Sequence, residues 1–255
     1  LAVAGLTIRF GGLTAVDQMS FEVRQGEVLS LIGPNGAGKT SAFNAITGYI
    51  APAAGAVSYR GARLNGRKPN EIAQLGVVRT FQKTSVFGGL SVLDNVLVGL
   101  HLRSKQQPLA ILLGAGSVAR EETALIAEAD STLQFIGLAA RAGPLAASLP
   151  YGELRLLEVA IALAAKPKLL LLDEPVCGLN PAETASFMQL LARIRARGIT
   201  VLLVEHDMKM VMGVSDRIVC LNQGRIIADG TPEAIRNNAE VVRAYLGTHR
   251  VGAAR

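Results

Sequence analysis

Eight residues, from Gly33 to Thr40, have the types and the spacing of a loop that binds phosphate. They fit the pattern G-x-x-x-x-G-K-[ST], in which glycines let successive backbone N–H groups turn inward around a polyphosphate, where a Cβ atom would block the approach. In this pattern Lys39 reaches the β- and γ-phosphates, and the Thr40 hydroxyl ligates Mg²⁺. The predicted binding residues are Gly33, Pro34, Asn35, Gly36, Ala37, Gly38, Lys39, Thr40 and Ser41.

The segments that flank this loop favour the same interpretation. Val28 to Ile32 is a short apolar run typical of a buried strand, and Ser41 to Ile46 has apolar residues at helical spacing. The N-terminus of such a helix would add its positive dipole at the phosphates. The alternative is a glycine-rich turn without a ligand, and the agreement of strand, loop, Lys-Thr pair and helix argues against it.

An apolar strand that ends in two carboxylates follows later in the chain. Lys168 to Asp173 contains four consecutive leucines, and Glu174 is the next residue. A buried strand that delivers two carboxylates to one place needs a cation there, and Mg²⁺ on a nucleotide satisfies this need. We expect Asp173 to hold Mg²⁺, directly or through water, and Glu174 to polarise a water molecule for in-line attack on the γ-phosphate.

Two further polar residues follow predicted strands. Gln82 ends the strand predicted over 76–82, and His206 comes just after the buried strand predicted over 199–204. Alone, a glutamine after a strand indicates a solvated loop, and a histidine at a strand end is often uninvolved in chemistry. In an open α/β sheet, however, ligands bind at the carboxyl ends of the strands. The sequence therefore predicts that both residues lie near the phosphate loop and the carboxylates.

The order of predicted elements indicates an α/β protein. Leu6 to Phe10 and Met19 to Val23 alternate as half-exposed strands do, which predicts antiparallel strands beside a parallel core. From Ser91 to about Ala147 the pattern becomes mostly helical, opened by a capping box at Ser91 and Asp94. The strand and helix pattern of the core then resumes.

Composition narrows the possible classes. Half of the 255 residues are hydrophobic and only 4% are aromatic, so the core must be aliphatic. The net charge is +6, and the sequence has no run of five like charges. A basic excess can indicate a nucleic-acid or membrane-surface partner, and an ordinary basic protein is the alternative. Cys177 and Cys220 are too few for a disulfide framework, so we expect a reducing compartment.

The sequence also bears on membrane insertion. The most apolar stretch without charge, 108–119, has about 12 residues, whereas a helix that spans a bilayer needs about 20. The first residues show no signal-peptide pattern. We expect a soluble protein that can still sit on a membrane partner.

Along essentially its whole length the sequence resembles the ATPase subunits of ABC transporters. Gly33 to Ser41 matches the Walker A motif, Leu169 to Asp173 matches Walker B, and Glu174 matches the catalytic glutamate. His206 matches the switch histidine, which in the family contacts the γ-phosphate, and Gln82 matches the Q-loop glutamine, which touches Mg²⁺ and couples to the membrane subunits. The resemblance implies that Lys39, Gln82, Glu174 and His206 are catalytic, and that Thr40, Gln82 and Asp173 hold the metal.

The resemblance extends to other positions and to the fold. Phe10 falls where the family places an aromatic residue that stacks on adenine, although a core position on a strand is the alternative. Gly178 to Asn180 falls on the D-loop. The implied fold is a P-loop NTPase core with a mostly parallel sheet, an N-terminal antiparallel β subdomain and an inserted helical subdomain. We expect one ABC ATPase domain over 1–255, with the core in 1–90 and 148–255 and the helical subdomain at about 91–147.

One motif departs from the family. Leu149-Pro-Tyr-Gly-Glu153 stands in the place of the Leu-Ser-Gly-Gly-Gln signature, which in the family closes on the γ-phosphate of the partner subunit's ATP. Pro150 replaces the serine, so one donor is lost, while Tyr151, Gly152 and Glu153 are still expected to face the partner's ATP. Asn180 also replaces the usual D-loop aspartate.

The finer resemblance is to the ATPases of branched-chain amino-acid (Liv-type) importers. It implies ATP and Mg²⁺ as ligands, a homodimer or a heterodimer with a sister subunit, integral membrane permease subunits, an indirect periplasmic or extracellular substrate-binding protein, and a peripheral place on the cytoplasmic face of the inner membrane. Closely related importers carry urea, short amides or aromatic acids. The matching stretches are 9–13, 76–82, the Pro-Tyr-Gly signature, 178–181, 205–213 and the tail 230–247.

Two hypotheses from other classes remain open. A soluble ABC protein that acts on nucleic acid would normally carry a long coiled-coil insert or a second cassette, and this chain has a short insert and one phosphate loop, so we expect no nucleic-acid partner. A nucleotide-binding regulatory subunit with low turnover is suggested by Pro150 and opposed by Glu174 and His206.

Overall fold

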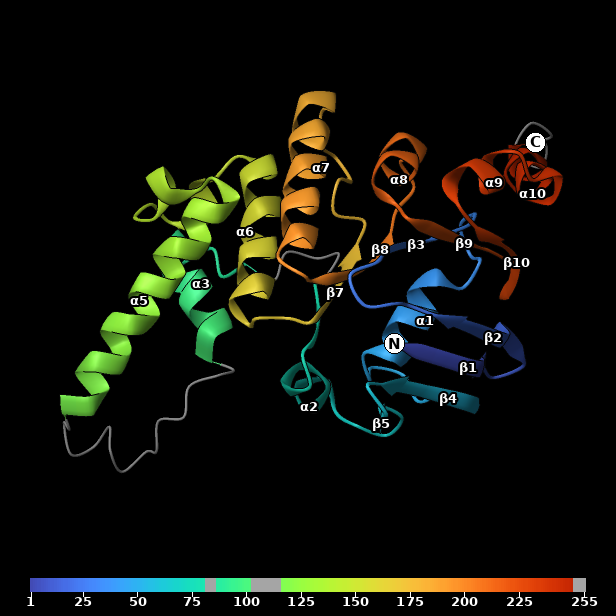
Figure 1. The fold of residues 1–255 in the computed structure, drawn as a ribbon, viewed down its shortest axis with the longest axis horizontal. Helices are drawn as coiled ribbons and strands as arrows, with labels where there is room; N and C mark the ends of the chain where they lie inside the picture. The colour runs from blue at the N-terminus through green and yellow to red at the C-terminus, as the bar shows by residue number, and fades with distance from the viewer. Residues whose placement is uncertain (81–85, 102–115, 250–255) are drawn as a thin grey trace. The chain divides into compact units, whose positions relative to one another are not determined.

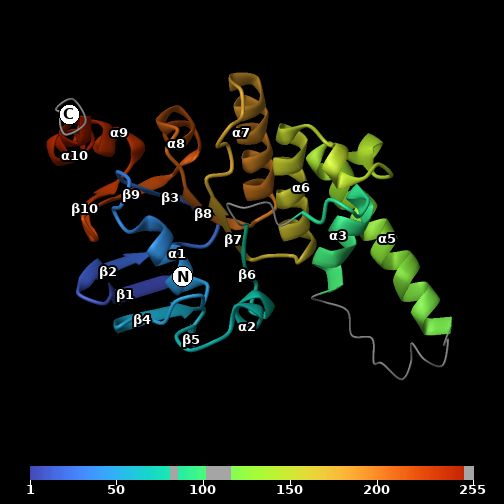
Figure 2. The ribbon, with the colours of Figure 1, turned by 180° about the vertical axis from the view of Figure 1, so that it is seen from behind.

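The computed structural model of the chain describes residues 1–80, 86–101 and 116–249 (Figures 1 and 2). Its chain divides into two compact units. The first unit combines Leu1–Arg79 with Lys168–Arg255, and the second is Thr80–Pro167. Each unit has its own packing, and the candidate site described below is built from the first.

A six-stranded sheet forms the centre of the first unit, in the order β10-β9-β3-β8-β7-β6. All neighbours are parallel except the β9–β10 hairpin at the edge. Every residue of β3, β7 and β8 is buried, as the continuous apolar runs predict for strands covered on both faces. The strands are β3 (Val28–Ile32), β6 (Val77–Arg79), β7 (Leu169–Asp173), β8 (Thr200–Val204), β9 (Arg217–Asn222) and β10 (Arg225–Gly230).

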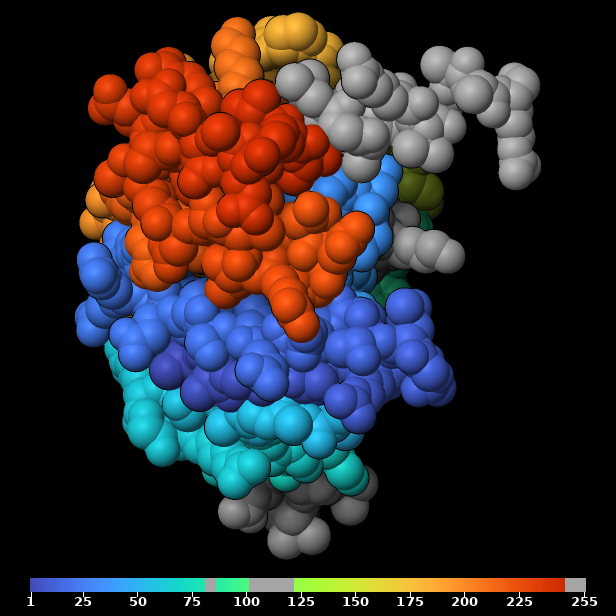
Figure 3. Space-filling view, turned by 90° about the vertical axis from the view of Figure 1, so that its right-hand side faces the viewer, coloured from blue at the N-terminus to red at the C-terminus, as the bar shows by residue number. Residues whose placement is uncertain are grey.

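The first unit also contains an antiparallel sheet in the order β2-β1-β4-β5. In β2 the side chains of Met19 and Phe21 are buried while those of Ser20 and Glu22 are exposed, so the predicted alternation is confirmed. β10 borders this sheet along β2, as the orange and blue surfaces in contact show (Figure 3). Arg225 there forms an ion pair with Asp17. The strands are β1 (Ala2–Phe10), β2 (Leu13–Glu22), β4 (Ala54–Tyr59) and β5 (Ala62–Arg63).

Helices cover both faces of the six-stranded sheet. One face and the antiparallel sheet enclose α1 in a shared aliphatic core, in which Phe43 is fully buried, and α8 to α10 pack on the other face around Ile32 and Cys220. The predicted start of α7 is confirmed, since Asn180 caps it and Pro181 is its first residue. The helices of this unit are α1 (Lys39–Ile46), α2 (Pro69–Gln74), α7 (Pro181–Ala196), α8 (Met208–Val214), α9 (Pro232–Arg236) and α10 (Ala239–His249).

Two elements differ from the sequence prediction. β6 ends at Arg79, so the strand expected over 76–82 is shorter than predicted, and Gln82 lies outside the described residues. Helix α10 was not among the predicted elements. It begins where the Asn238 side chain accepts hydrogen bonds from the next turn, and it is held by Val241, which packs in the core around Ile32.

The second unit is helical. It contains α3 (Val92–His101), α5 (Gly116–Ile136) and α6 (Tyr151–Ala164), which pack against one another, and two short 3-10 turns. Helices α3 and α6 approach closely at Gly99, where a Cβ atom would collide with the Ile161 carbonyl. The predicted capping box is found in part: the backbone N–H of Asp94 donates to the Ser91 hydroxyl at 3.0 Å, and that hydroxyl donates to Asp94 Oδ2 at 2.6 Å.

The second unit, Thr80–Pro167, covers more residues than the helical subdomain expected at 91–147. It ends at Pro167 because α6 packs on α3 and α5. The description of 1–255 as one domain with a helical subdomain stays a prediction. Among the described helices, none is both long enough and apolar enough to cross a bilayer.

Candidate functional site

The predicted phosphate loop connects the end of β3 to the start of α1. Three of its glycines adopt positive φ angles, +148° at Gly33, +79° at Gly36 and +103° at Gly38. Added Cβ atoms would collide with the Leu221 carbonyl at Gly33 and come within 2.5 Å of the Ala15 carbonyl at Gly38. All three glycines favour the backbone path, and Gly33 and Gly38 are also required for its close contact with neighbouring strands.

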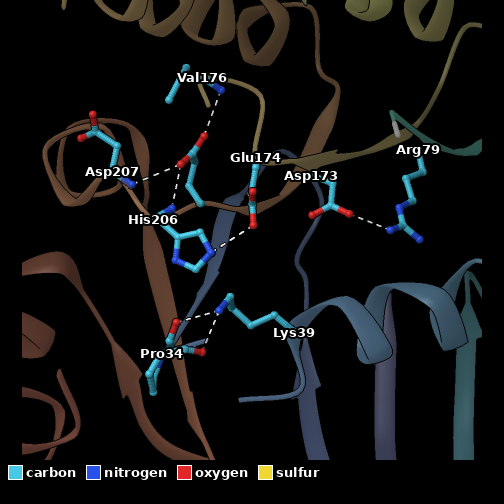
Figure 4. A network of polar contacts seen from close by, with 10 residues as sticks. Pro34, Lys39, Arg79, Asp173, Glu174, Val176, His206 and Asp207 are labelled. Atoms are coloured by element: carbon cyan, nitrogen blue, oxygen red, sulfur yellow. Dashed lines mark hydrogen bonds and ion pairs between the residues drawn. The ribbon is translucent and has the colours of Figure 1, made fainter. Parts of the chain in front are cut away.

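Lys39, the first residue of α1, turns its side chain back into the loop. Its Nζ donates hydrogen bonds to the carbonyls of Gly33 (2.7 Å) and Pro34 (3.1 Å) (Figure 4). Burial lowers the pKa of Lys39, and the carboxylates of Glu174 and Asp173 oppose this shift. The ammonium group is thus held inside the loop, facing carboxylates, where it can move onto phosphate oxygens.

The predicted catalytic pair lies at the ends of β7 and β8. These neighbouring parallel strands bring Glu174 and His206 together, with His206 Nε2 3.0 Å from Glu174 Oε1 (Figure 4). Glu174 has a φ angle of +50°, which is uncommon for a residue with a side chain and which is one form of backbone strain that clusters at active sites. A carboxylate held by an imidazole is suited to general-base chemistry.

Glu205 fixes the segments on which this pair stands, and the sequence analysis did not single it out. Its side chain is 3% exposed and accepts hydrogen bonds from the backbone N–H groups of Val176 (3.0 Å), His206 (2.7 Å) and Asp207 (3.1 Å). The bonds link the loop after Glu174 to the loop that carries His206. Its place directly before His206, at the end of an apolar strand, was the only signal in the sequence.

Asp173 ends β7 with its side chain fully buried. Burial raises the pKa of Asp173, and the guanidinium of Arg79, whose Nη2 lies 2.6 Å from Asp173 Oδ2, opposes the rise. Arg79 is the second residue that the sequence analysis did not single out. A charged residue that ends a buried apolar strand was the available signal.

A pocket of about 330 Å³ joins most of the predicted residues of the first unit, but Gly33, Pro34 and Asp173 do not line it. Phe10 stands on its wall with 48% of its surface exposed, which rules out the alternative of a core position. Leu13 and Ala15, which the sequence analysis did not name, complete the wall beside Phe10. The other lining residues are Asn35, Gly36, Ala37, Gly38, Lys39, Thr40, Ser41, Glu174 and His206.

The remaining predicted residues lie elsewhere. Tyr151, Gly152 and Glu153 belong to the second unit, where they form the first turn of α6 with Pro150 as its N-cap, without a side-chain capping bond. Tyr151 Oη accepts hydrogen bonds from Arg155 Nε (3.0 Å) and Nη2 (2.6 Å). Gln82 lies outside the described residues.

The donor set fits Mg²⁺ bound together with a nucleotide. Among the described residues, no group of three or more His, Cys, Asp or Glu side chains forms a ready-made metal site. Mg²⁺ usually takes one or two carboxylates together with phosphate oxygens and water. A buried carboxylate at Asp173 and an exposed hydroxyl-bearing residue, Thr40, on the pocket wall satisfy that requirement.

Comparisons with known proteins agree with this geometry. The ABC transporter family model matches residues 16–177, and a model of the branched-chain amino acid ATP-binding cassette transporter matches 225–251. The chain is 47% identical over 248 residues to the high-affinity branched-chain amino acid transport ATP-binding protein LivG of Salmonella typhimurium strain LT2, covering 97% of each chain. It is 44% identical, with the same coverage, to the corresponding protein BraF of Pseudomonas aeruginosa.

Solved structures give the same result for the fold. The crystal structure of the ADP conformation of an ATP-binding cassette of an ABC transporter superposes with a TM-score of 0.85 at 30% identity, covering 96% of this chain and 98% of the other. A nucleotide-free cassette superposes with a TM-score of 0.83 at 30% identity, with 96% and 97% covered. The predicted fold class is confirmed. The chain belongs to the ABC transporter family, as an ATP-binding subunit that hydrolyses ATP.

Proposed function

We propose that this subunit powers an importer of branched-chain amino acids. The observation that carries the proposal is the similarity to LivG and BraF, which covers 97% of each chain. The match of a separate tail model to 225–251 supports it, because nucleotide chemistry does not require that segment. Urea, short amides and aromatic acids are the alternative substrates.

Each of the pocket residues has its own role in ATP binding or hydrolysis. Phe10 stacks on the adenine ring, and the backbone N–H groups of the loop bind the phosphates. Lys39 exchanges the carbonyls of Gly33 and Pro34 for the β- and γ-phosphates, which its position inside the loop permits. Glu174 polarises a water molecule for in-line attack, and His206 orients Glu174 and contacts the γ-phosphate.

Thr40, Gln82 and Asp173 hold Mg²⁺ in this proposal. Mg²⁺ held there would supply positive charge to offset the negative charge that develops on the phosphates during transfer. Asp173 contributes a buried carboxylate, and Thr40 contributes a hydroxyl at the first turn of α1. Both residues therefore act by fixing the phosphates relative to Glu174.

The subunit works in a pair. Two ATPase subunits, copies or sisters, join head to tail, and the α6 turn of one, Tyr151-Gly152-Glu153, faces the ATP of the other. The pair sits on integral membrane permease subunits at the cytoplasmic face of the inner membrane, and a substrate-binding protein delivers the amino acid outside. The N-terminus of α6 supports this role, since helix N-termini attract phosphate. No nucleic-acid partner is part of the proposal.

Uptake of labelled leucine in cells that lack the gene tests the proposal. Wild type and the surface variant Glu240→Gln should restore uptake, whereas Glu174→Gln should not. Excess unlabelled isoleucine and valine should compete, and urea, acetamide and phenylalanine should not. Unchanged uptake in the deleted strain, or competition by urea or phenylalanine alone, would contradict the assignment to branched-chain amino acids.

A further inference from the structure

Arg79 makes more contacts in the candidate site than its place at the end of a three-residue strand would suggest. Its Nη2 lies 2.6 Å from Asp173 Oδ2, and its Nη1 donates to Asn44 Oδ1 (2.7 Å) and Thr47 Oγ1 (3.3 Å). Its guanidinium carbon lies 5.4 Å from the centroid of the Phe43 ring. One planar group therefore joins β6, the last residue of β7 and the buried side of α1.

The residues on α1 make this guanidinium rigid. Asn44, Thr47 and Phe43 belong to α1 or its C-cap, and the helix begins with Lys39 and Thr40 at the phosphate loop. The Arg79 side chain is 7% exposed and that of Asp173 is 0% exposed, so water does not compete for the ion pair. The guanidinium fork sets the position of Asp173 relative to the helix that carries Thr40.

The orientation of the Asp173 carboxylate follows from this contact. Oδ2 is the oxygen bound by Arg79, and the second oxygen is turned away from Arg79, toward the side of Glu174 (Figure 4). Glu174, the residue after Asp173, lines the pocket that also contains Lys39. The carboxylate thus has one oxygen on a fixed cation and the other on the side of Glu174.

We propose that Arg79 is a positioning residue for the Mg²⁺ site, which holds Asp173 by Oδ2 so that its other oxygen meets the ion bound with ATP. This inference rests on the proposed role of Asp173 as a metal ligand. Arg79 does not line the pocket, so in this proposal it acts on the ion only through Asp173. Partners that orient a metal ligand typically contribute about 10–100-fold to metal affinity.

Lysine is the informative replacement at this position. Arg79→Lys keeps a positive charge beside Asp173, but a single ammonium does not reproduce a fork whose two nitrogens bind different residues. Arg225→Lys is the matched control, since Arg225 also forms an ion pair with an aspartate, at 2.6 Å to Asp17, and is 74% exposed. If the Arg79–Asp173 ion pair is only structural, Arg79→Lys should change ATP affinity equally with and without Mg²⁺. If Arg79 positions the metal ligand, only the affinity with Mg²⁺ should change.

The experiment measures the affinity of the full-length chain for a fluorescent ATP analogue with excess Mg²⁺ and with EDTA, and the affinity of the chain–ATP complex for Mn²⁺ by electron paramagnetic resonance. We expect Arg79→Lys to reduce the Mg²⁺-dependent gain in ATP affinity, and the Mn²⁺ affinity, by about 10-fold. Its affinity in EDTA should equal that of wild type, which also shows that the variant is folded. Arg225→Lys should match wild type in all three values.

The variant Asp173→Asn distinguishes the positioning role of Arg79 from the proposed role of Asp173 as a metal ligand. It should abolish most of the Mg²⁺-dependent gain, and adding Arg79→Lys to it should reduce that gain no further. A normal gain in Arg79→Lys, together with a lost gain in Asp173→Asn, would overturn the role of Arg79 alone. A normal gain in Asp173→Asn would overturn the metal role of Asp173. Equal losses with Mg²⁺ and with EDTA in Arg79→Lys would identify the contact as structural and overturn this inference.

Discussion

Glu174 Oε1 and His206 Nε2 lie 3.0 Å apart although 32 residues separate them in the chain. The contact follows from the parallel pairing of β7 with β8, in which Asp173 is the partner of Val204. Each side chain then leaves the same edge of the sheet, and both line the pocket that contains Lys39. Because Glu174 and His206 contact each other on the wall of this pocket, substitutions of either residue should change ATP hydrolysis in ways that can be predicted.

Replacing Glu174 by glutamine should separate binding from turnover. Glutamine keeps the size and an oxygen that can contact His206, but it is not a base. We expect ATP affinity within a few-fold of wild type and a kcat lower by on the order of 10²–10⁴. Single-turnover phosphate release from the assembled transporter is the measurement. Turnover near that of wild type would rule out Glu174 as the base.

Replacing His206 should be strongly non-additive with the replacement of Glu174. If the imidazole acts by orienting Glu174, His206→Ala lowers kcat in the wild-type background and has little further effect in Glu174→Gln. The four ATPase rates of the cycle test this expectation. Independent, multiplicative losses would instead show that His206 acts on the phosphate without Glu174.

Glu205→Gln should lower both the stability of the protein and its rate of ATP hydrolysis. A carboxylate accepts the three backbone hydrogen bonds that Glu205 receives, whereas an amide presents one oxygen and an NH₂ group that faces donors. We expect the free energy of unfolding to fall by about 1–3 kcal/mol and kcat to fall as His206 loses its support. Urea unfolding and ATPase rates give the two values, with the exposed Glu240→Gln as the control. Unchanged stability would show that these bonds contribute little.

The strands that position the site could be predicted because their sequences are uniform over their length. β3, β7 and β8 are buried in full, so each appears as a mainly apolar run, and the candidates for chemistry came within two residues of the end of each run. The three glycines of 33–38 adopt positive φ angles, a conformation that glycine favours, so their spacing in the sequence already indicated this loop. The loop, Asp173, Glu174 and His206 could therefore be predicted as site residues before any tertiary contact was known.

The supporting residues could not be found in this way, because their partners are distant in sequence. Arg79 meets Asp173 across 94 residues, and its importance lies in that contact and not in the strand that carries it. Glu205 reaches Val176 only because β7 and β8 are neighbours. Phe10 ends a strand of mixed burial, so its sequence gave no basis for deciding between core and pocket, and its 48% exposure decided it.

Phe10→Ala should weaken recognition of the base and leave recognition of the phosphates. The ring lies on the wall of the pocket that also contains the phosphate loop, and base–aromatic stacking is worth about 1–3 kcal/mol. We expect ATP affinity to fall about 5- to 100-fold and the affinity for inorganic tripolyphosphate to be unchanged. Isothermal titration of both ligands makes the comparison, with Phe10→Tyr as the variant that keeps an aromatic ring. Equal losses for the two ligands would show that Phe10 supports the loop and not the base.

Alkaline pH should destabilise the first unit through Cys220. Burial raises the pKa of the Cys220 thiol from 9.0 to about 11, and its side chain is 0% exposed. A raised pKa means that the folded state keeps its proton while the unfolded state loses it, so this contribution to stability is complete below pH 9 and is lost as the pH rises toward 11. Two pKa units correspond to about 2.7 kcal/mol. Burial likewise raises the pKa of Tyr245 from 10.0 to about 12, which extends the loss to higher pH.

Urea unfolding of wild type, Cys220→Ala and Cys177→Ser at pH 8.5 and pH 10.5 measures this effect. Between the two pH values Cys220→Ala should lose up to about 2 kcal/mol less stability than wild type, because its unfolded state gains no thiolate at position 220. Cys177 is exposed, so Cys177→Ser should follow wild type. The comparison of differences removes the cost of the small cavity, which is the same at both pH values. Equal losses in wild type and Cys220→Ala would mean that the thiol ionises at the same pH in the folded and unfolded chain.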